Sequence, residues 1–195
     1  MLTVDFDYDQ EGMTVPYEPL VDELRSNHGF SDLRGRPDLA INIAETSRSP
    51  ALRALIGGLA HSGSAFHTLG CDLGAHEEPW RGEALQQVAG GYVQIISADY
   101  DGRSPEDYTA LGQFLAHSLE DDARNQDWSL KFVVQPVVLT LDDYSGLVVS
   151  LHIWFFAAGA TEEAAYQSRD ELIAALHRAL IKDQAALVVT DGHGD

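Results

Sequence analysis

The sequence predicts an α+β protein, and three features support that class. Residues 91–191 read as strand, helix, strand, strand, helix, strand. The strand segments are rich in β-branched and aromatic residues, whereas the helical segments have apolar residues at helical spacing behind clear start signals. Residues 1–90 alternate shorter strand and helix signals. We therefore expect an N-terminal βαβαβ part over 1–90 and a βαββαβ part over 91–195, with a soft boundary at Gly90-Gly91 or a single domain.

The N-terminal part begins with a strand. Residues 2–8 alternate apolar and polar side chains, which is typical of a half-exposed strand. Residues 9–16 are expected to form a loop. A helix is expected over residues 19–27, where Pro19 can occupy the first helical position, and a strand over residues 39–44.

A second helix is predicted to begin at Ser49-Pro50, where a hydroxyl cap precedes proline at the first helical position. Its apolar residues recur at i, i+3, i+4 and i+7 and should form one buried stripe: Leu52, Leu55, Ile56 and Leu59. An extended segment is expected over residues 65–75. A short helix over residues 83–89 would then lead to the boundary.

The C-terminal part has the stronger signals. Its elements are, in chain order, a strand, a helix, a hairpin of two strands, a helix and a strand: 92–99, 105–123, 130–141 with 146–157, 162–181 and 186–190. This order is the split-βαβ, or ferredoxin-like, arrangement. The N-terminal part would pack against it, which could place two sheets back to back. Element order alone does not define a function, because this fold carries many.

Composition restricts the classes of function. Thirty-one Asp and Glu residues against 12 Lys and Arg residues give a formal net charge of −19. Such a charge repels phosphate backbones and anionic membrane surfaces, so neither nucleic acid nor membrane is an expected partner. No phosphate-binding glycine loop occurs, and no cofactor is expected. A single cysteine and the lack of a signal-peptide pattern favour a cytoplasmic protein.

One face of the predicted hairpin is the first candidate site. The alternate residues Val149, Leu151, Ile153 and Phe155 are all apolar, so that side should face the helices. A four-residue turn would place His152 opposite Gln135 on the other side. The central neighbouring strand would then add further groups, which gives the candidate ligand-binding set His152, Gln135, Gln94, Ser150, Trp154 and Tyr92. This mixture suits a small-molecule pocket, and it suits better an interface covered by the N-terminal part or a second copy.

A second candidate is a metal site. His67, Cys71 and His76 are residue types that bind zinc, but their spacing matches no compact motif. On a regular strand His67 and Cys71 would share a face and lie about 13 Å apart, too far to ligate one ion. A core cysteine with scattered polar histidines is therefore the favoured interpretation. No serine, cysteine and histidine arrangement carries a catalytic signature, which argues against an enzyme.

The preferred prediction is a non-catalytic protein-interaction module, for example an inhibitor or immunity-type protein that neutralises a basic partner. Self-association through a sheet face is a second form of the same idea. The alternative is a small-molecule binder or enzyme that uses His152, Gln135, Gln94 and Trp154. A metal protein that uses His67, Cys71 or His76 is the third.

Overall fold

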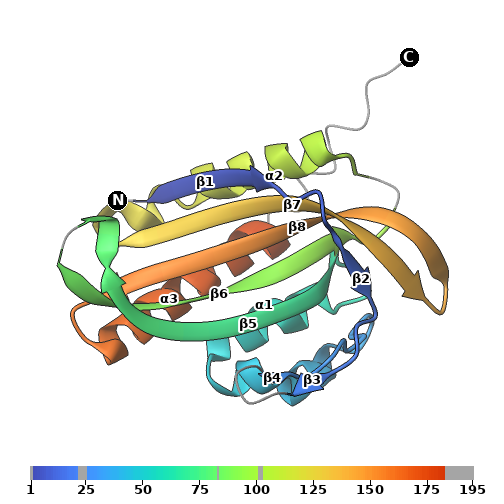
Figure 1. Ribbon diagram of the computed structural model, residues 1–195, viewed down its shortest axis with the longest axis horizontal. Coiled ribbons are helices and arrows are strands. Elements are labelled where there is room, and N and C mark those ends of the chain that lie inside the picture. The colour runs from blue at the N-terminus through green and yellow to red at the C-terminus, as the bar shows by residue number, and fades with distance from the viewer. Residues whose placement is uncertain (1, 22–25, 83, 101–102, 183–195) are drawn as a thin grey trace.

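The computed structural model describes residues 2–21, 26–82, 84–100 and 103–182. It is an α+β structure in which one six-stranded sheet carries its α-helices on a single face (Figure 1). The strand order is β1-β7-β8-β6-β5, and β2 pairs with β7 beyond the end of β1. β1 and β2 run parallel to β7, and all the other pairings are antiparallel.

The sheet strands are β1 (Thr3–Tyr8), β2 (Met13–Val15), β5 (Phe66–Pro79), β6 (Leu85–Ser97), β7 (Trp128–Leu141) and β8 (Tyr144–Gly159). The α-helices are α1 (Pro50–Leu59), α2 (Pro105–Ser118) and α3 (Glu162–His177). A separate two-stranded sheet joins β3 (Leu20–Val21) and β4 (Ser26–Asn27). Single turns of helix complete the described chain: η1 (Pro37–Asn42), η2 (Ala44–Ser47), η3 (Trp80–Gly82), η4 (Asp122–Asn125) and the π-helical η5 (Arg178–Lys182). No helix among the described residues is long and apolar enough to cross a membrane.

The main core lies between the sheet and the three helices. Leu151, Ile153 and Phe155 of β8 are fully buried there, as the alternation of the sequence predicted. One face of α3 and η5 also meets this core, since each of these residues is buried: Ala165, Arg169, Leu172, Ile173, Leu176 and Leu180. Periodic apolar residues thus define which side of each element meets the core.

The predicted helix starts are confirmed by their hydrogen bonds. The Ser49 hydroxyl accepts from the backbone N–H of Leu52 at 3.0 Å. Ser104 and Asp107 form a reciprocal capping box at the start of α2. Each cap satisfies backbone donors that have no partner inside the helix, and the acidic residues of the first turn complement the helix dipole.

Three N-terminal elements differ from their predictions. Residues 20–21 and 26–27 form the β3–β4 pair instead of a helix, and Leu20 is exposed; residues 22–25 of the predicted helix lie outside the described residues. The predicted strand over residues 39–44 is wrong, because these residues belong to the 3₁₀ helices η1 and η2, with Ile43 between them; Ile41, an apolar residue of the predicted strand, is exposed. Met13–Val15, expected to be loop, is β2.

The predicted helix over residues 83–89 is also wrong, because β6 begins at Leu85 and pairs with β5 in a long hairpin. Cross-strand pairing overrides local propensity here. The expected boundary at Gly90-Gly91 falls inside β6, and strands from both expected parts share one sheet. Within the described residues a back-to-back pair of sheets is not confirmed. The strand predicted over residues 186–190 lies outside the described residues.

Candidate binding face of the sheet

The face of the sheet opposite the helices carries a row of chemically distinct side chains. The strand register aligns five residues across five strands, in the order Asp5, Lys131, Trp154, Tyr92 and Asp72. Paired residues point to the same side of a pleated sheet, so all five belong to the open face. The row therefore has a carboxylate at each edge and aromatic side chains in the middle.

Four aromatic rings on this side, which we call the aromatic face, form a continuous cluster: Tyr92, His152 and Trp154 contact one another, and Phe156 stacks with Trp154 at 6.3 Å between centroids. The His152 and Trp154 rings stack with centroids 4.8 Å apart, and the Tyr92 ring is 4.2 Å from His152 and 4.9 Å from Trp154. All four side chains are partly exposed. A side chain at Gly90 would come within 2.4 Å of the Phe156 ring, so glycine is required for that ring to lie across β6.

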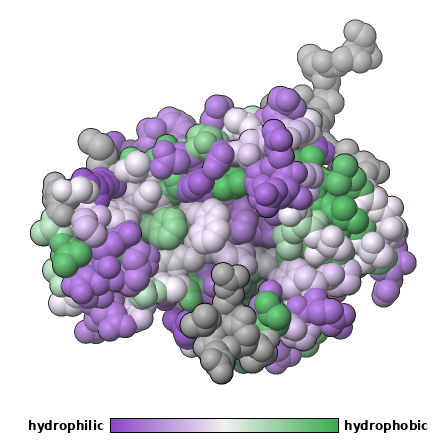
Figure 2. All heavy atoms as spheres, viewed as in Figure 1, coloured by the Kyte–Doolittle hydropathy of each residue, from purple (hydrophilic) through white to green (hydrophobic). Residues whose placement is uncertain are grey.

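The surface view of this side shows the same division. Pale atoms of intermediate hydropathy occupy the middle of the face, and purple hydrophilic atoms gather along its upper border (Figure 2). At that border, Lys131 forms an ion pair with Asp7 at 3.0 Å. The hydrogen bond from Lys131 lowers the pKa of Asp7. The cation of this row is thus already paired, and Asp5 is exposed beside it.

The predicted polar groups Gln94 and Ser150 lie on this face but are held in hydrogen bonds within the sheet. The Gln94 side-chain amide donates to the Ser150 hydroxyl at 3.0 Å, and that hydroxyl donates to the backbone carbonyl of Gln135 at 3.2 Å. All three residues are buried. They link β6, β8 and β7 to one another instead of presenting polar groups to a ligand.

The hairpin turn is two residues shorter than predicted. Leu141 pairs with Tyr144, so His152 lies opposite Val133 and Ser150 lies opposite Gln135. A shift of two residues keeps every side chain on its predicted face, whereas a shift of one would have exchanged the faces. The predicted neighbour of His152 on β6, Gln94, is confirmed.

His152 has an unusual electrostatic position. Burial lowers its pKa to about 4, and the negative charge of Asp9 only partly opposes that effect. The imidazole is therefore neutral at physiological pH. Its Nε2 atom is buried and finds no hydrogen-bond partner within the described part of the chain. A buried polar atom without a partner costs free energy, which a bound group or water at this point would recover.

The N-terminal segment covers one end of the open face. Val15 is fully buried against Leu69 of β5, Ile96 of β6 and Val137 of β7 in a second apolar cluster. The Tyr17 hydroxyl donates to the backbone carbonyl of Leu69 at 3.2 Å. The N-terminal segment therefore covers one end of the sheet, and the aromatic face lies on the part that it leaves open.

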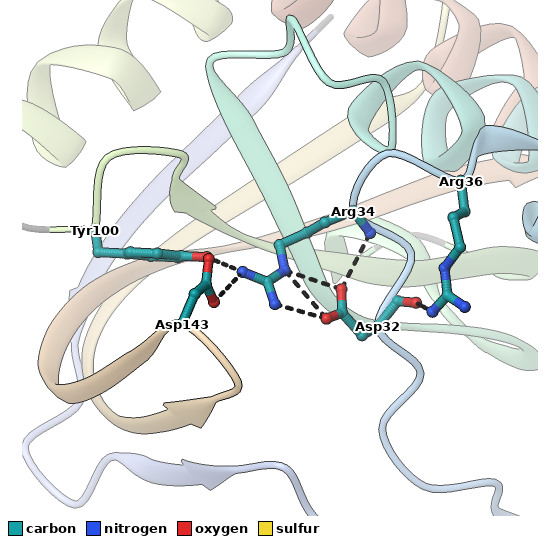
Figure 3. Close-up of polar contacts among 5 residues, drawn as sticks. All are labelled: Asp32, Arg34, Arg36, Tyr100 and Asp143. Carbon is teal, nitrogen blue, oxygen red and sulfur yellow. Dashed lines mark hydrogen bonds and ion pairs between the residues drawn. The ribbon is translucent and has the colours of Figure 1, made fainter.

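An arginine that the sequence analysis did not single out lies beside this covered end, where its partner Tyr100 packs against the same apolar cluster. Arg34 forms an ion pair with Asp32 at 2.7 Å and with Asp143 in the β7–β8 turn at 2.7 Å, and it also donates to the Tyr100 hydroxyl (Figure 3). The Arg34 hydrogen bonds lower the pKa values of both carboxyl groups. The neighbouring Arg36 donates to the backbone carbonyl of Asp32. Spacing in sequence could not reveal this cluster, since its members come from three separate segments.

The predicted metal candidates are not brought together. A β-bulge between Thr68 and Gly70 places His67 on the open face and Cys71 on the covered face. His76 forms an exposed ion pair with Glu78 at 3.2 Å. In the described ranges, no three His, Cys, Asp or Glu side chains gather in a metal-binding arrangement. Burial raises the pKa of Cys71 to about 12, so its thiol is protonated and weakly nucleophilic.

Together the fold and this face define an α+β protein with a one-sided helical layer and an open aromatic sheet surface. No protein-family model, curated protein or solved structure matches the chain. Function is therefore argued from the chemistry of the face itself.

Proposed function

We propose that the protein is a non-catalytic binding module that holds a basic segment of a partner protein on the open face of its sheet. The observation that carries this proposal is the cross-strand row in which Trp154 and Tyr92 lie between Asp72 on one side and, on the other, Lys131, whose charge is paired with Asp7, followed by Asp5. A Lys or Arg side chain over a Trp or Tyr ring gains about 0.5–2 kcal/mol, and flanking carboxylates add charge complementarity. A formal net charge of −19 would speed the approach of such a partner.

The state of the face also supports a partner rather than a closed structural layer. Partly exposed Trp and Tyr residues are the side chains most enriched in interface hot spots.

The small-molecule alternative keeps only part of its predicted site. Gln94, Gln135 and Ser150 are buried and linked through Ser150, which leaves His152, Trp154 and Tyr92 as groups that a ligand could reach. These three groups offer stacking surfaces but few convergent polar contacts. They suit the flat contact of a protein segment better than the specific recognition of a metabolite.

Two finer inferences accompany this proposal. An inhibitor or immunity-type role in the cytoplasm remains the concrete form that the acidic charge suggests. The ferredoxin-like relation of the C-terminal part is also retained as an inference, with β6, α2, β7, β8 and α3 in its chain order. β5 would then lie beside β6 at the position that the fourth strand takes in that arrangement.

The test is binding of a fluorescent octa-arginine peptide to the full chain and to Trp154→Ala, followed by fluorescence anisotropy. We expect Trp154→Ala to weaken binding about tenfold, a loss of about 1.4 kcal/mol. The matched control is Tyr166→Ala, which removes a partly exposed ring on α3, away from the face.

Three outcomes decide the proposal. Equal weakening in both variants, or in neither, would mean that diffuse charge alone attracts the peptide, and the proposal would fail. A dimer that dissociates in Trp154→Ala but not in Tyr166→Ala would assign the face to a second copy of this chain instead. Circular dichroism of both variants verifies that they are folded.

A further inference from the structure

A cavity of about 580 Å³ lies at the free edge of β5, next to η1, η2 and residues 27–33. Its volume is within the range of small-molecule sites, about 300–1,000 Å³. Most of the aliphatic part of its lining comes from Leu33, Ile43, Ile56 and Leu69, and Ala44 adds a smaller group. Neutral polar groups complete much of the remainder: Asn27, Ser31, Asn42 and Thr68.

The charges that line the cavity have one sign. Glu45 and Asp72 contribute carboxylates, and no Lys or Arg of the described chain belongs to the lining. Arg48, outside the lining, lies 4.0 Å from Asp72 and partly balances it. Glu45 is close enough to act electrostatically on the Tyr17 and Tyr92 hydroxyls. An anionic ligand is therefore disfavoured and a cation is favoured.

Two tyrosines form the aromatic part of the wall. Tyr17 and Tyr92 approach each other over Gly70, where an added side chain would lie 2.9 Å from the Tyr17 hydroxyl and 3.9 Å from the Tyr92 ring. The absence of a side chain at Gly70 thus leaves the space between the rings. Burial raises the pKa of both tyrosines, so their hydroxyls stay neutral and can donate hydrogen bonds.

We propose that this cavity binds an organic cation, an alkylammonium or guanidinium group on an apolar stem. The charged head would lie at Glu45 beside the Tyr17 and Tyr92 rings, and the stem would pack on Ile56 and Leu33. Carboxylate and aromatic walls together are the chemistry that recognises such cations. The site does not depend on the proposed peptide face, although Tyr92 and Asp72 contribute to both.

The test is isothermal titration of the full chain with agmatine and putrescine, and with 1,4-butanediol as the neutral analogue of putrescine. We expect both amines to bind and the diol not to bind. Glu45→Gln should weaken agmatine binding at least tenfold. Glu77→Gln removes the same charge from an exposed position on β5 outside the cavity, and we expect it to leave binding unchanged.

Several results would overturn the proposal. The first is that neither amine gives a heat of binding up to about 10 mM, a concentration that would reveal even millimolar affinity. The second is that the diol binds as well as the amines. The third is an equal loss of agmatine binding in Glu45→Gln and Glu77→Gln. If Glu45→Gln fails to fold, Tyr17→Leu provides a second variant, which should also weaken agmatine binding. Trp154→Ala should leave agmatine binding intact, so this test is separate from that of the peptide face.

A second arm identifies the source of the cation. A blocked Gly-Gly-Arg-Gly-Gly peptide that displaces agmatine would mean that the cavity accepts an arginine side chain of a partner. Binding of agmatine without competition from this peptide would mean that the ligand is a free amine. Both results support the cation site, and displacement by free glutamate instead of the peptide would contradict it.

Discussion

The two faces of the same sheet differ in how completely their side chains are buried. Leu151, Ile153 and Phe155 of β8 lie under the helices without detectable exposure, whereas the intervening His152 and Trp154 remain partly open. Alternating side chains of one strand therefore belong to a fully buried core on one face and to a partly exposed surface on the other. Binding chemistry is expected on the second face, because uncovered aromatic area on a folded protein usually marks an interaction site.

Polar groups follow the same division. Under the helices, the Trp128 indole donates to Ser168 at 3.0 Å, and the buried Arg169 pairs with Asp170 at 2.8 Å. On the open face, His152 keeps a buried nitrogen without a partner in the described residues. The covered face thus satisfies these groups, although the Nε atom of Arg103 beside the Phe66 ring is also buried without a partner in the described chain; the open face holds two such nitrogens, on His67 and His152.

The largest expected effect is a difference in stability between neighbouring positions of β8. Phe155→Ala should lower the free energy of unfolding by about 3–5 kcal/mol, because it leaves a cavity in a closed core. Trp154→Ala should cost clearly less, since its ring is partly exposed and its loss opens no sealed cavity. Urea unfolding of both variants measures the two values.

The same pair gives the converse result for binding, so it tests the comparison from both sides. Trp154→Ala should lose peptide affinity, whereas a Phe155 variant that still folds, such as Phe155→Leu, should keep it. Equal stability losses in the two alanine variants would mean that the open face is as much a core as the covered one.

The sequence predicted the covered face well because that face depends on periodicity. Apolar alternation in residues 146–157 and the stripes of the helices have one physical cause, burial against a neighbour, and the structure confirms them. The strand register of the hairpin was harder to predict from the sequence. The length of the turn at Asp142-Asp143 differed from the prediction by two residues, and only the even size of that shift preserved the faces.

The N-terminal segment was predicted poorly because its structure depends on distant contacts. β2 exists through pairing with β7, and the 3₁₀ turns after Pro37 lie against α1. The bulge at Thr68–Gly70 moved His67 and Cys71 to opposite faces, which no spacing rule could foresee. Arg34 likewise gains its role from Asp143 and Tyr100, which are remote in sequence.

A second prediction concerns pH and His152. Its pKa falls from 6.5 to about 4 on folding, so the folded state favours the neutral ring. The resulting stability is fully present above pH 6.5 and is lost as pH falls towards 4, because the unfolded chain then binds the proton more strongly. The loss should be about 3 kcal/mol.

His152→Gln isolates this contribution, since the titrating carboxylates are common to both proteins. We expect the unfolding free energies of the two to converge or cross between pH 6.5 and 4, with the wild type losing more. If the unfolding free energies of the two proteins changed with pH in parallel, the imidazole would have the same pKa in the folded and unfolded chains. The His152 ring would then be more solvated than its burial indicates.

The smallest effect is expected where polar contacts, not apolar burial, hold the covered end of the open face. Arg34→Ala should lower stability by about 1–2 kcal/mol, less than a buried pair would, because Asp143 is 62 % exposed and solvent screens its ion pair. Arg34→Lys keeps the charge but loses the planar fork that contacts Asp32 and Asp143 together, so it should recover only part of the loss. Urea unfolding at low salt and at about 1 M salt measures both, and salt should shrink the difference between wild type and Arg34→Ala.

Hydrogen exchange at Val15 should rise in Arg34→Ala while exchange at Ile153 stays unchanged. If both positions exchanged faster by the same factor, the N-terminal segment would open only when the whole molecule unfolds. The two faces of the sheet would then belong to one cooperative unit, and the N-terminal segment would not open locally.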